Sequence, residues 1–386
     1  MTKAIKNKVN NGLVLRGKAW SYVLRVPDPI TGRTKPKWVG GFDSEKSAAL
    51  ARDKARVALG QGNYIEPTHV TVADFISVWI EGHAMRIKPT TLHSYRGLIA
   101  SYLIPRLGAI KLQNLKPSDI ERFYIELITT AGKAGKPLHP ATAGKCVAIL
   151  KKCLTYAVNT EALLMFNPAS RVSIPTAVCK RPTPLTRGEL QTFLHEATSH
   201  RLFFFFRLSA YTGARRGELL ALRWLDFDGK AITISKSRTM AGRAVVEQNS
   251  TKGGHGQRRV ALDPQTVELF NAHRKRQLEE RLVMGSSWQE SGYVFVQESG
   301  EPLDVGTPTK LFRKIGNKAK LRPTRLHDLR HLHASELLRL GEPLHVVSNR
   351  LGHRDPMVTA TIYAHVSNEQ NETASNTFAN GSRVVM

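Results

Sequence analysis

Two arginines, two histidines and a late tyrosine follow one another in an order that suits the cleavage of a phosphodiester. These residues are Arg215, His327, Arg330, His353 and Tyr363. In-line displacement at phosphorus builds negative charge on the nonbridging oxygens and requires the attacking oxygen to lose a proton. Guanidinium groups stay charged and bind phosphate oxygens through two N–H groups at once. A histidine can carry a proton near neutral pH, and a tyrosine can attack as a nucleophile.

The local sequences around these residues resemble the tyrosine recombinase (phage integrase) family. Thr-Gly-Ala-Arg ends at Arg215, His-Asp-Leu-Arg spans 327–330, Leu-Gly-His ends at His353, and Thr-Ile-Tyr-Ala-His surrounds Tyr363. The resemblance covers residues 185–367 with specific motifs and extends more loosely over the N-terminal half. It implies a site-specific DNA recombinase that cuts and rejoins strands through a 3′-phosphotyrosine intermediate in a tetrameric synapse.

The resemblance implies a role for each candidate residue. Arg215 and Arg330 bind the phosphate, and Tyr363 is the nucleophile. His327 assists proton transfer or holds a phosphate oxygen, and a pKa near neutrality would permit either role. His353 donates a hydrogen bond to the same phosphate.

The leaving 5′ oxygen needs an acid, and Lys252 matches the lysine that supplies it in the family. Lys252 lies in Ser-Thr-Lys-Gly-Gly-His-Gly, which we interpret as a flexible hairpin connection between two short strands. Lys236 is the rival for this role. Glu218, three residues beyond Arg215, is expected to orient that arginine rather than to react.

The histidines also permit a different interpretation, a metal site formed by His327, His331, His333 and His353. No acidic or cysteine ligand accompanies them at a spacing typical of zinc, and Arg330 lies between them. We therefore expect no metal and treat His331 and His333, which depart from the family's usual residues here, as structural. Because a phosphotyrosine linkage would conserve the phosphodiester energy, we also expect no cofactor, neither ATP nor Mg²⁺.

The charge of the chain points to a polyanionic partner. The sequence holds 57 Lys+Arg against 31 Asp+Glu, a formal net charge of +26. Such an excess repels itself in a compact state unless a polyanion neutralises it, so we expect double-stranded DNA as the partner. An anionic membrane is the competitor, but no run approaches the roughly 20 apolar residues needed to span a bilayer. The most hydrophobic run, 202–206, predicts a buried helix.

Two sequence features indicate the compartment. No apolar segment of a secretory signal follows Met1. Cys146, Cys153 and Cys179 form no Cys-x-x-Cys pair, which argues against a disulfide framework and fits a reducing cytoplasm. We expect the protein in the cytoplasm of a bacterial host, associated with the nucleoid.

The fold class we expect is a multidomain, mainly α protein with small antiparallel β-sheets. Residues 1–65 are basic and predict a three-stranded sheet followed by a helix that Ser44 begins. This pattern resembles the arm-type DNA-binding domain of many integrases. Residues 70–172 predict four amphipathic helices, a bundle similar to the family's core-binding domain. A proline-containing, basic linker follows the bundle.

Residues 183–386 are expected to form the catalytic domain with a C-terminal tail. Thr-Arg-Gly-Glu at 186–189 is a capping box that begins the first helix. Three short strands are predicted near 231–235, 244–247 and 259–262, and Pro264 begins the next helix. The expected architecture is a mixed α+β domain that is mostly helical.

The resemblance implies an integrase of a phage or other mobile element, acting as a homotetramer on double-stranded DNA attachment sites. An excisionase and a host DNA-bending protein are possible additional partners in such systems. Two alternatives remain at this point. A type IB topoisomerase shares the tyrosine and the arginines, and a non-catalytic DNA-binding regulator would share the charge and the N-terminal domain.

Overall fold

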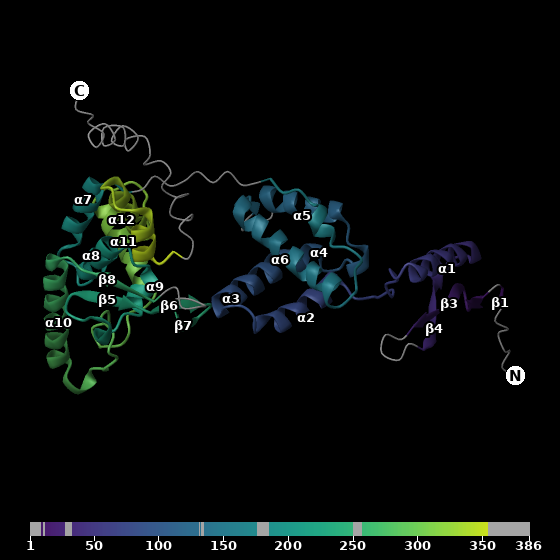
Figure 1. Ribbon diagram of the computed structural model, residues 1–386, viewed down its shortest axis with the longest axis horizontal. Helices are drawn as coiled ribbons and strands as arrows, with labels where there is room; N and C mark the ends of the chain where they lie inside the picture. Colours follow the sequence, from purple (N-terminus) through teal and green to yellow (C-terminus); the bar gives the residue numbers. More distant parts are fainter. Residues whose placement is uncertain are drawn as a thin grey trace, which may run out of the picture. The chain divides into compact units, whose positions relative to one another are not determined.

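The computed structural model describes residues 9–10, 12–27, 33–130, 132, 135–175, 185–249 and 257–353. The chain divides into two compact units, Met1–Cys179 and Lys180–Met386 (Figure 1). In each unit, capping residues begin helices, and in the second unit glycines end some of them. Among the described residues, no helix is long and apolar enough to cross a bilayer.

The first unit begins with an antiparallel sheet in the order β1-β2-β3-β4. The strands are β1 (Val9–Asn10), β2 (Leu13–Arg16), β3 (Ala19–Pro27) and β4 (Thr34–Phe42), followed by α1 (Glu45–Gly60). Because side chains alternate between the faces of a strand, Tyr22 and Leu24 share one face and pack with Ala48 of α1. The predicted sheet backed by a helix is confirmed, and the two-residue strand β1 adds a fourth strand to it. Ser44 caps α1 as expected.

The same unit contains the predicted bundle of four amphipathic helices. Its elements are α2 (Val72–Ala84), α3 (Pro89–Leu98), α4 (Ile104–Leu107), α5 (Pro117–Thr129) and α6 (Pro140–Asn159). A π-helical turn, Ile99–Leu103, joins α3 to α4, so these two form one long helix interrupted ahead of Pro105. Cys146 and Cys153 lie buried in the core between the helices, where burial raises the pKa of both thiols.

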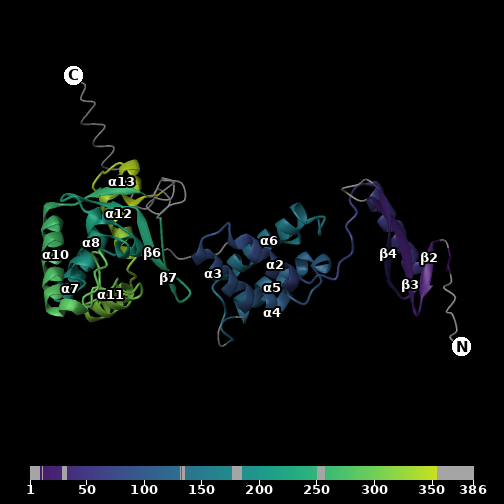
Figure 2. The ribbon, with the colours of Figure 1, turned by 90° about the horizontal axis from the view of Figure 1, so that it is seen from below.

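The second unit is mostly helical. Its helices are α7 (Arg187–Ala197), α8 (Phe203–Thr212), α9 (Arg216–Leu220), α10 (Pro264–Met284), α11 (Thr307–Lys318), α12 (Asp328–Arg339) and α13 (Leu344–Leu351). In both views α10 lies along one side of the unit, and α12 packs beside α13 away from it (Figures 1 and 2). The capping box at Thr186 and Glu189 begins α7 as predicted.

The strands of the second unit differ from the sequence prediction. The described residues of this unit form four strands: β5 (Ala231–Ile234), β6 (Lys236–Ala241), β7 (Ala244–Asn249) and β8 (Arg258–Ala261). They form two separate antiparallel pairs, β5 with β8 and β6 with β7. The prediction missed β6 because its sequence, Lys-Ser-Arg-Thr-Met-Ala, lacks alternating apolar residues. The strands on either side of Lys252, β7 and β8, therefore belong to different pairs, and the connection predicted between them lies outside the described residues.

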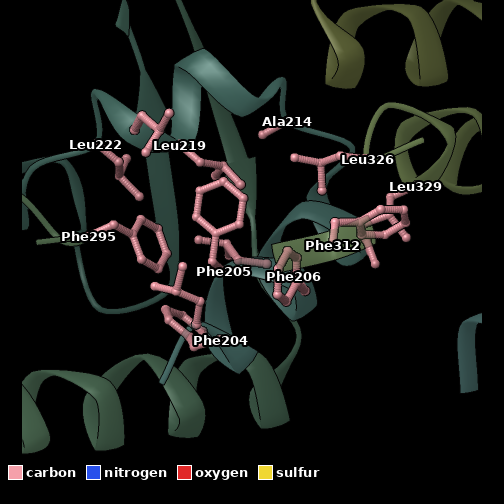
Figure 3. Close-up of a cluster of buried hydrophobic side chains, with 14 of the residues drawn as sticks. Phe204, Phe205, Phe206, Ala214, Leu219, Leu222, Phe295, Phe312, Leu326 and Leu329 are labelled. Atoms are coloured by element: carbon pink, nitrogen blue, oxygen red, sulfur yellow. The ribbon is translucent and has the colours of Figure 1, made fainter. Parts of the chain in front are cut away.

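The core of the second unit is built around α8. The predicted buried helix is confirmed, since Phe204, Phe205 and Phe206 are each at most 3% exposed. Their rings pack against Phe295 and Phe312, and Leu219, Leu326 and Leu329 close the cluster (Figure 3). Burying a large apolar side chain stabilises a fold by about 1.5–3 kcal/mol. The end of α8, which leads directly to Arg215, is therefore held on a rigid support.

Candidate active site

A glycine turn places Arg215 at the end of α8. Gly213 ends the helix with φ +64°, a left-handed backbone conformation that residues other than glycine rarely adopt. A Cβ at this position would also lie 2.6 Å from Leu351 Cδ2 and 2.8 Å from His333 Cδ2. Arg215 then caps the N-terminus of α9. The Thr-Gly-Ala-Arg frame thus lets the chain turn sharply while it lies against α12 and α13.

Arg330 joins two of the sequence motifs through backbone carbonyls. Its side chain is buried, with 3% of the residue exposed. Nη1 donates to the carbonyl oxygen of Gly213 at 2.7 Å, and Nη2 donates to that of Leu351 at 2.7 Å. The guanidinium therefore ties the turn before Arg215 to the turn before His353.

Glu218 orients Arg215, as the sequence predicted, and it does so from a buried position. Its carboxylate accepts hydrogen bonds from the backbone N–H of Arg215 at 2.8 Å and from Nη1 at 2.9 Å. Arg258 donates to the same carboxylate from Nη1 at 3.2 Å and Nη2 at 2.8 Å. Burial by itself raises the pKa of Glu218, but the hydrogen bonds and charge of Arg258, with the charge of Arg215, lower it to about 2. The group is an ionised anchor and carries no proton at neutral pH.

Arg258 is a site residue whose role the sequence analysis did not identify. It begins β8, and its Nε donates to the carbonyl oxygen of Arg350 at 2.8 Å. Gly352 has φ +67°, and a Cβ there would lie 2.8 Å from Nη1 of Arg258. The signal that could have found it is the alternation of β8, since Arg258 shares a strand face with buried Val260. Arg258 thus connects Glu218 to the Leu-Gly-His turn.

The two candidate histidines are neutral at pH 7 in the free protein. Loss of water contact around His327, followed by the charges of His331, Arg330 and Arg215, lowers its pKa to about 4. Burial and nearby arginines, Arg330 first, lower the pKa of His353 to about 4 as well. The near-neutral pKa expected for His327 from the sequence is therefore wrong for the free protein. The main cause is burial of both rings, and the arginines that the fold gathers around them lower the pKa further.

The four histidines of the metal alternative do not share one environment. The rings of His327 and His331 meet edge to face, with centroids 4.9 Å apart. His333 instead accepts a hydrogen bond through Nε2 from Nε of Arg350 at 3.0 Å. Its imidazole thus binds a residue of α13, which agrees with the structural role expected of His333.

Two of the six candidate residues, Lys252 and Tyr363, lie outside the described residues. Lys236, the rival of Lys252, is described on β6. Its Nζ lies 3.4 Å from Oε1 of Glu247, and the side chain is 45% exposed. This ion pair gives Lys236 a partner on the neighbouring strand β7.

Arg215, His327 and Arg330 line a single hollow of about 520 Å³. Segments far apart in the chain form its wall: the end of α8, α9, β6, α11 and the start of α12. None of the described residues that line the hollow is acidic. The geometry suits a phosphate group, because the charged N–H donors that line the hollow outnumber the two carboxylates that pair with them, those of Glu218 and Asp328.

Acid is expected to destabilise the second unit through His333. Burial and the charge of Arg350 lower its pKa from 6.5 to about 3. Below pH 6.5 this histidine binds a proton in the unfolded chain but stays neutral in the folded chain. Its contribution to the free energy of unfolding is therefore full above pH 6.5 and is lost as the pH falls from 6.5 to 3. The slope is at most about 1.4 kcal/mol per pH unit for one such group.

Urea unfolding of His333→Gln at several pH values measures this effect. Between pH 6 and 4, the free energy of unfolding of the variant should depend less on pH, by the slope that corresponds to one proton. His345→Gln, an exposed histidine on α13, serves as the matched control and should retain the slope of the unmodified protein. Identical slopes for both variants would contradict the assignment.

Comparisons with known proteins agree on one family. Residues 184–370 match the model of the phage integrase family. Residues 71–128 match the N-terminal SAM-like domain of phage integrases, and residues 13–55 match an arm DNA-binding domain. A tyrosine recombinase XerC-like protein of Caldanaerobacter subterraneus is 29% identical over 359 residues, covering 86% of this chain and 89% of that protein.

Solved structures show the same fold. The Tn1549 transposon integrase in complex with a circular intermediate DNA superposes with a TM-score of 0.68 at 18% identity, covering 80% of this chain and 100% of that one. A lambda integrase tetramer bound to a Holliday junction superposes with a TM-score of 0.56 at 20% identity, covering 90% and 97%. The arrangement of helices and small sheets is therefore common to these proteins.

Proposed function

The chain belongs to the tyrosine recombinase (phage integrase) family, and we propose that it is the site-specific integrase of a phage or other mobile element. Its substrates are then double-stranded DNA attachment sites. The observation that carries this proposal is the hollow that Arg215, His327 and Arg330 line together, with the His353 turn held beside it by Arg330. A hollow lined by arginines and by no described carboxylate can stabilise the negative charge that develops on a phosphodiester in the transition state.

The proposed reaction exchanges one phosphodiester for another. Tyr363 Oη attacks phosphorus, the bond to the 5′ oxygen breaks, and a 3′-phosphotyrosine and a free 5′ hydroxyl result. Arg215 and Arg330 neutralise the nonbridging oxygens, and His353 donates a hydrogen bond to the same phosphate. His327, neutral at pH 7, can accept the tyrosine proton or hold a phosphate oxygen. Lys252 gives a proton to the leaving oxygen.

Rejoining reverses these steps with a hydroxyl from the partner duplex. Because the phosphotyrosine bond conserves the energy of the broken bond, these residues need no nucleotide cofactor to reseal the strand. We propose that four copies bind two duplexes and exchange one strand pair before the other. An excisionase and a host DNA-bending protein complete the proposed set of partners, and the proposed location is the bacterial cytoplasm at the nucleoid.

The proposal divides the work among three segments. Residues 1–65 bind arm-type DNA, residues 70–172 bind the core site, and residues 183–386 form the catalytic domain with its tail. In the arm segment, the sheet face away from α1 carries Arg16, whose guanidinium lies 4.1 Å from the ring centroid of half-exposed Trp38. A cation stacked on an exposed ring offers both charge and contact area to a DNA groove.

Footprinting tests the arm segment. The full chain should protect arm-type sites in addition to a core site, and a chain beginning at Thr71 should protect the core site alone. Arg16→Gln should weaken protection of the arm sites only. Identical footprints for the full and shortened chains would remove the arm-binding function from residues 1–65.

A nicked suicide substrate tests the reaction itself. Loss of a short fragment after cleavage should trap a covalent complex that survives denaturation, with protein on the 3′ phosphate and a free 5′ hydroxyl on the released strand. Protein attached to a 5′ phosphate would overturn the proposal. Relaxation of plasmids without any attachment site, at a rate unchanged by adding one, would instead favour a type IB topoisomerase.

Replacing Lys252 should slow cleavage by removing the acid that protonates the leaving oxygen. A substrate with sulfur in place of the 5′ bridging oxygen needs no such proton, so Lys252→Ala should regain most of the rate on that substrate. Lys236→Ala is the matched control and should cleave both substrates at nearly the normal rate. If sulfur rescues the Lys236 variant instead, the acid is Lys236.

A further inference from the structure

The hollow that contains Arg215 and Arg330 extends beyond the residues that the proposed reaction uses. Four further arginines line it, and we refer to them as the flanking arginines. They are Arg216, Arg238, Arg313 and Arg325. They come from α9, β6, α11 and the loop ahead of α12. Arg325 pairs with the carboxylate of Asp328, and a phosphate bound by Arg215 and Arg330 leaves the charges of Arg216, Arg238 and Arg313 available to a second ligand.

Two of the flanking arginines are oriented by a hydrogen bond from one guanidinium nitrogen to an uncharged oxygen. Arg216 Nη1 donates to Oγ1 of Thr309 on α11 at 2.8 Å. Arg238 Nη1 donates to the carbonyl oxygen of Leu303 at 2.6 Å. Both acceptors are uncharged, so these bonds orient the guanidinium groups without neutralising them. Oriented but uncompensated cations form a site for an anion.

A glycine brings two of these arginines together. Gly217 lies in the first turn of α9, where a Cβ would be 2.5 Å from Oγ of Ser237 and 2.9 Å from the carbonyl oxygen of Arg238. The strand β6 therefore lies directly against α9, which puts Arg238 in the same hollow as Arg216. Arg325 donates from Nη2 to Oδ1 of Asp328 at 3.3 Å, and Arg313 lies exposed on α11.

The ligand chemistry follows from the geometry of a DNA strand. Each strand carries one phosphate for about every 3.4 Å along the helix axis, so a bound scissile phosphate has charged neighbours on both sides. A hollow of about 520 Å³ is larger than one phosphate group requires. Its second set of cations can therefore meet the next phosphate of the same strand.

We propose that the flanking arginines and Thr309 bind the backbone phosphate adjacent to the scissile phosphate on the cleaved strand. This subsite sets the register of the strand, so that Tyr363 attacks one phosphodiester and not its neighbour. The inference rests on the proposed recombinase function. It adds positioning residues to that function and leaves the chemical steps unchanged.

Single methylphosphonate substitutions test the subsite. Each removes the charge of one chosen phosphate in a duplex that carries the binding site. The full-length protein should bind about 10-fold more weakly when the adjacent phosphate is neutral, a loss typical of one charge-assisted contact. Arg313→Gln should bind the unmodified duplex more weakly than the unmodified protein does, and it should lose less additional affinity when that same phosphate is neutral.

The salt dependence and a neighbouring residue supply the controls. Arg313→Gln should lower the slope of log affinity against log salt concentration by about 0.9, the value for one phosphate contact. Lys314→Gln removes a charge from the next position of α11, which does not line the hollow, and should show no coupling to this phosphate. Arg216→Gln should reproduce the coupling of Arg313→Gln from a second side of the hollow.

Two outcomes separate this inference from the proposed function. Purely additive losses for Arg313→Gln and Arg216→Gln at every phosphate would overturn the subsite, even if the suicide substrate still traps a covalent complex. Cleavage that stays at one phosphodiester in both variants would overturn the register role. Absence of any covalent complex with the unmodified protein would instead overturn the recombinase function.

Discussion

Tyr363→Phe is expected to abolish the covalent complex with a suicide substrate while leaving DNA binding unchanged. The substitution removes one oxygen, the atom proposed to attack phosphorus, and keeps the ring. No other group in the proposed reaction can form the phosphotyrosine bond, so the loss should be complete rather than graded. Denaturing gels measure the covalent complex, and a mobility shift of the same duplex measures binding.

Tyr211→Phe is the matched control for this experiment. Tyr211 lies at the exposed end of α8, with the guanidinium of Arg207 3.5 Å from its ring centroid. Removal of its hydroxyl preserves that stacking and should leave cleavage at the normal rate. A covalent complex formed by Tyr363→Phe would assign the nucleophile to another residue.

Arg330→Gln is expected to slow cleavage by about 10²–10³-fold, the usual effect of losing one group that stabilises transition-state charge. The variant should also unfold more easily. The carbonyl oxygens of Gly213 and Leu351 would each lose a buried donor at 2.7 Å, and an unsatisfied buried acceptor costs about 1–3 kcal/mol. Single-turnover cleavage and urea unfolding measure the two effects.

A second variant on the same helix separates catalysis from folding. Arg339→Gln removes a partly exposed guanidinium at the other end of α12, where it pairs with Glu336 at 3.0 Å. Surface pairs of this kind contribute about 0–1 kcal/mol, so both rate and stability should stay near normal. If Arg330→Gln loses stability but cleaves at the full rate, Arg330 supports the fold and does not bind the scissile phosphate.

Local sequence was sufficient to predict much of the fold. The periodicity of 70–172 predicted the bundle, and the capping residues Ser44 and Thr186 predicted where α1 and α7 begin. These features depend on neighbours within one or two turns of the chain. The strand β6 was not predicted because its own sequence has no alternating apolar pattern. Its pairing with β7 and its contact with α9 stabilise it instead.

The residue types determined the chemistry that the site can perform. Arginines, histidines and a tyrosine in these frames suit phosphodiester cleavage wherever the fold puts them, and Gly213 and Gly352 supply turns that a side chain would strain. Such properties belong to the residue and its immediate neighbours. Sequence motifs therefore indicated the reaction before any contact was known.

Tertiary structure alone decided how these residues act on one another. Arg330 reaches carbonyls of Gly213 and Leu351, and Arg258 reaches Glu218, across long stretches of chain. The same convergence lowers the pKa of His327 and His353 and gathers the flanking arginines in one hollow. Burial and charge at a point in space depend on every segment that packs there, so no local pattern could predict them.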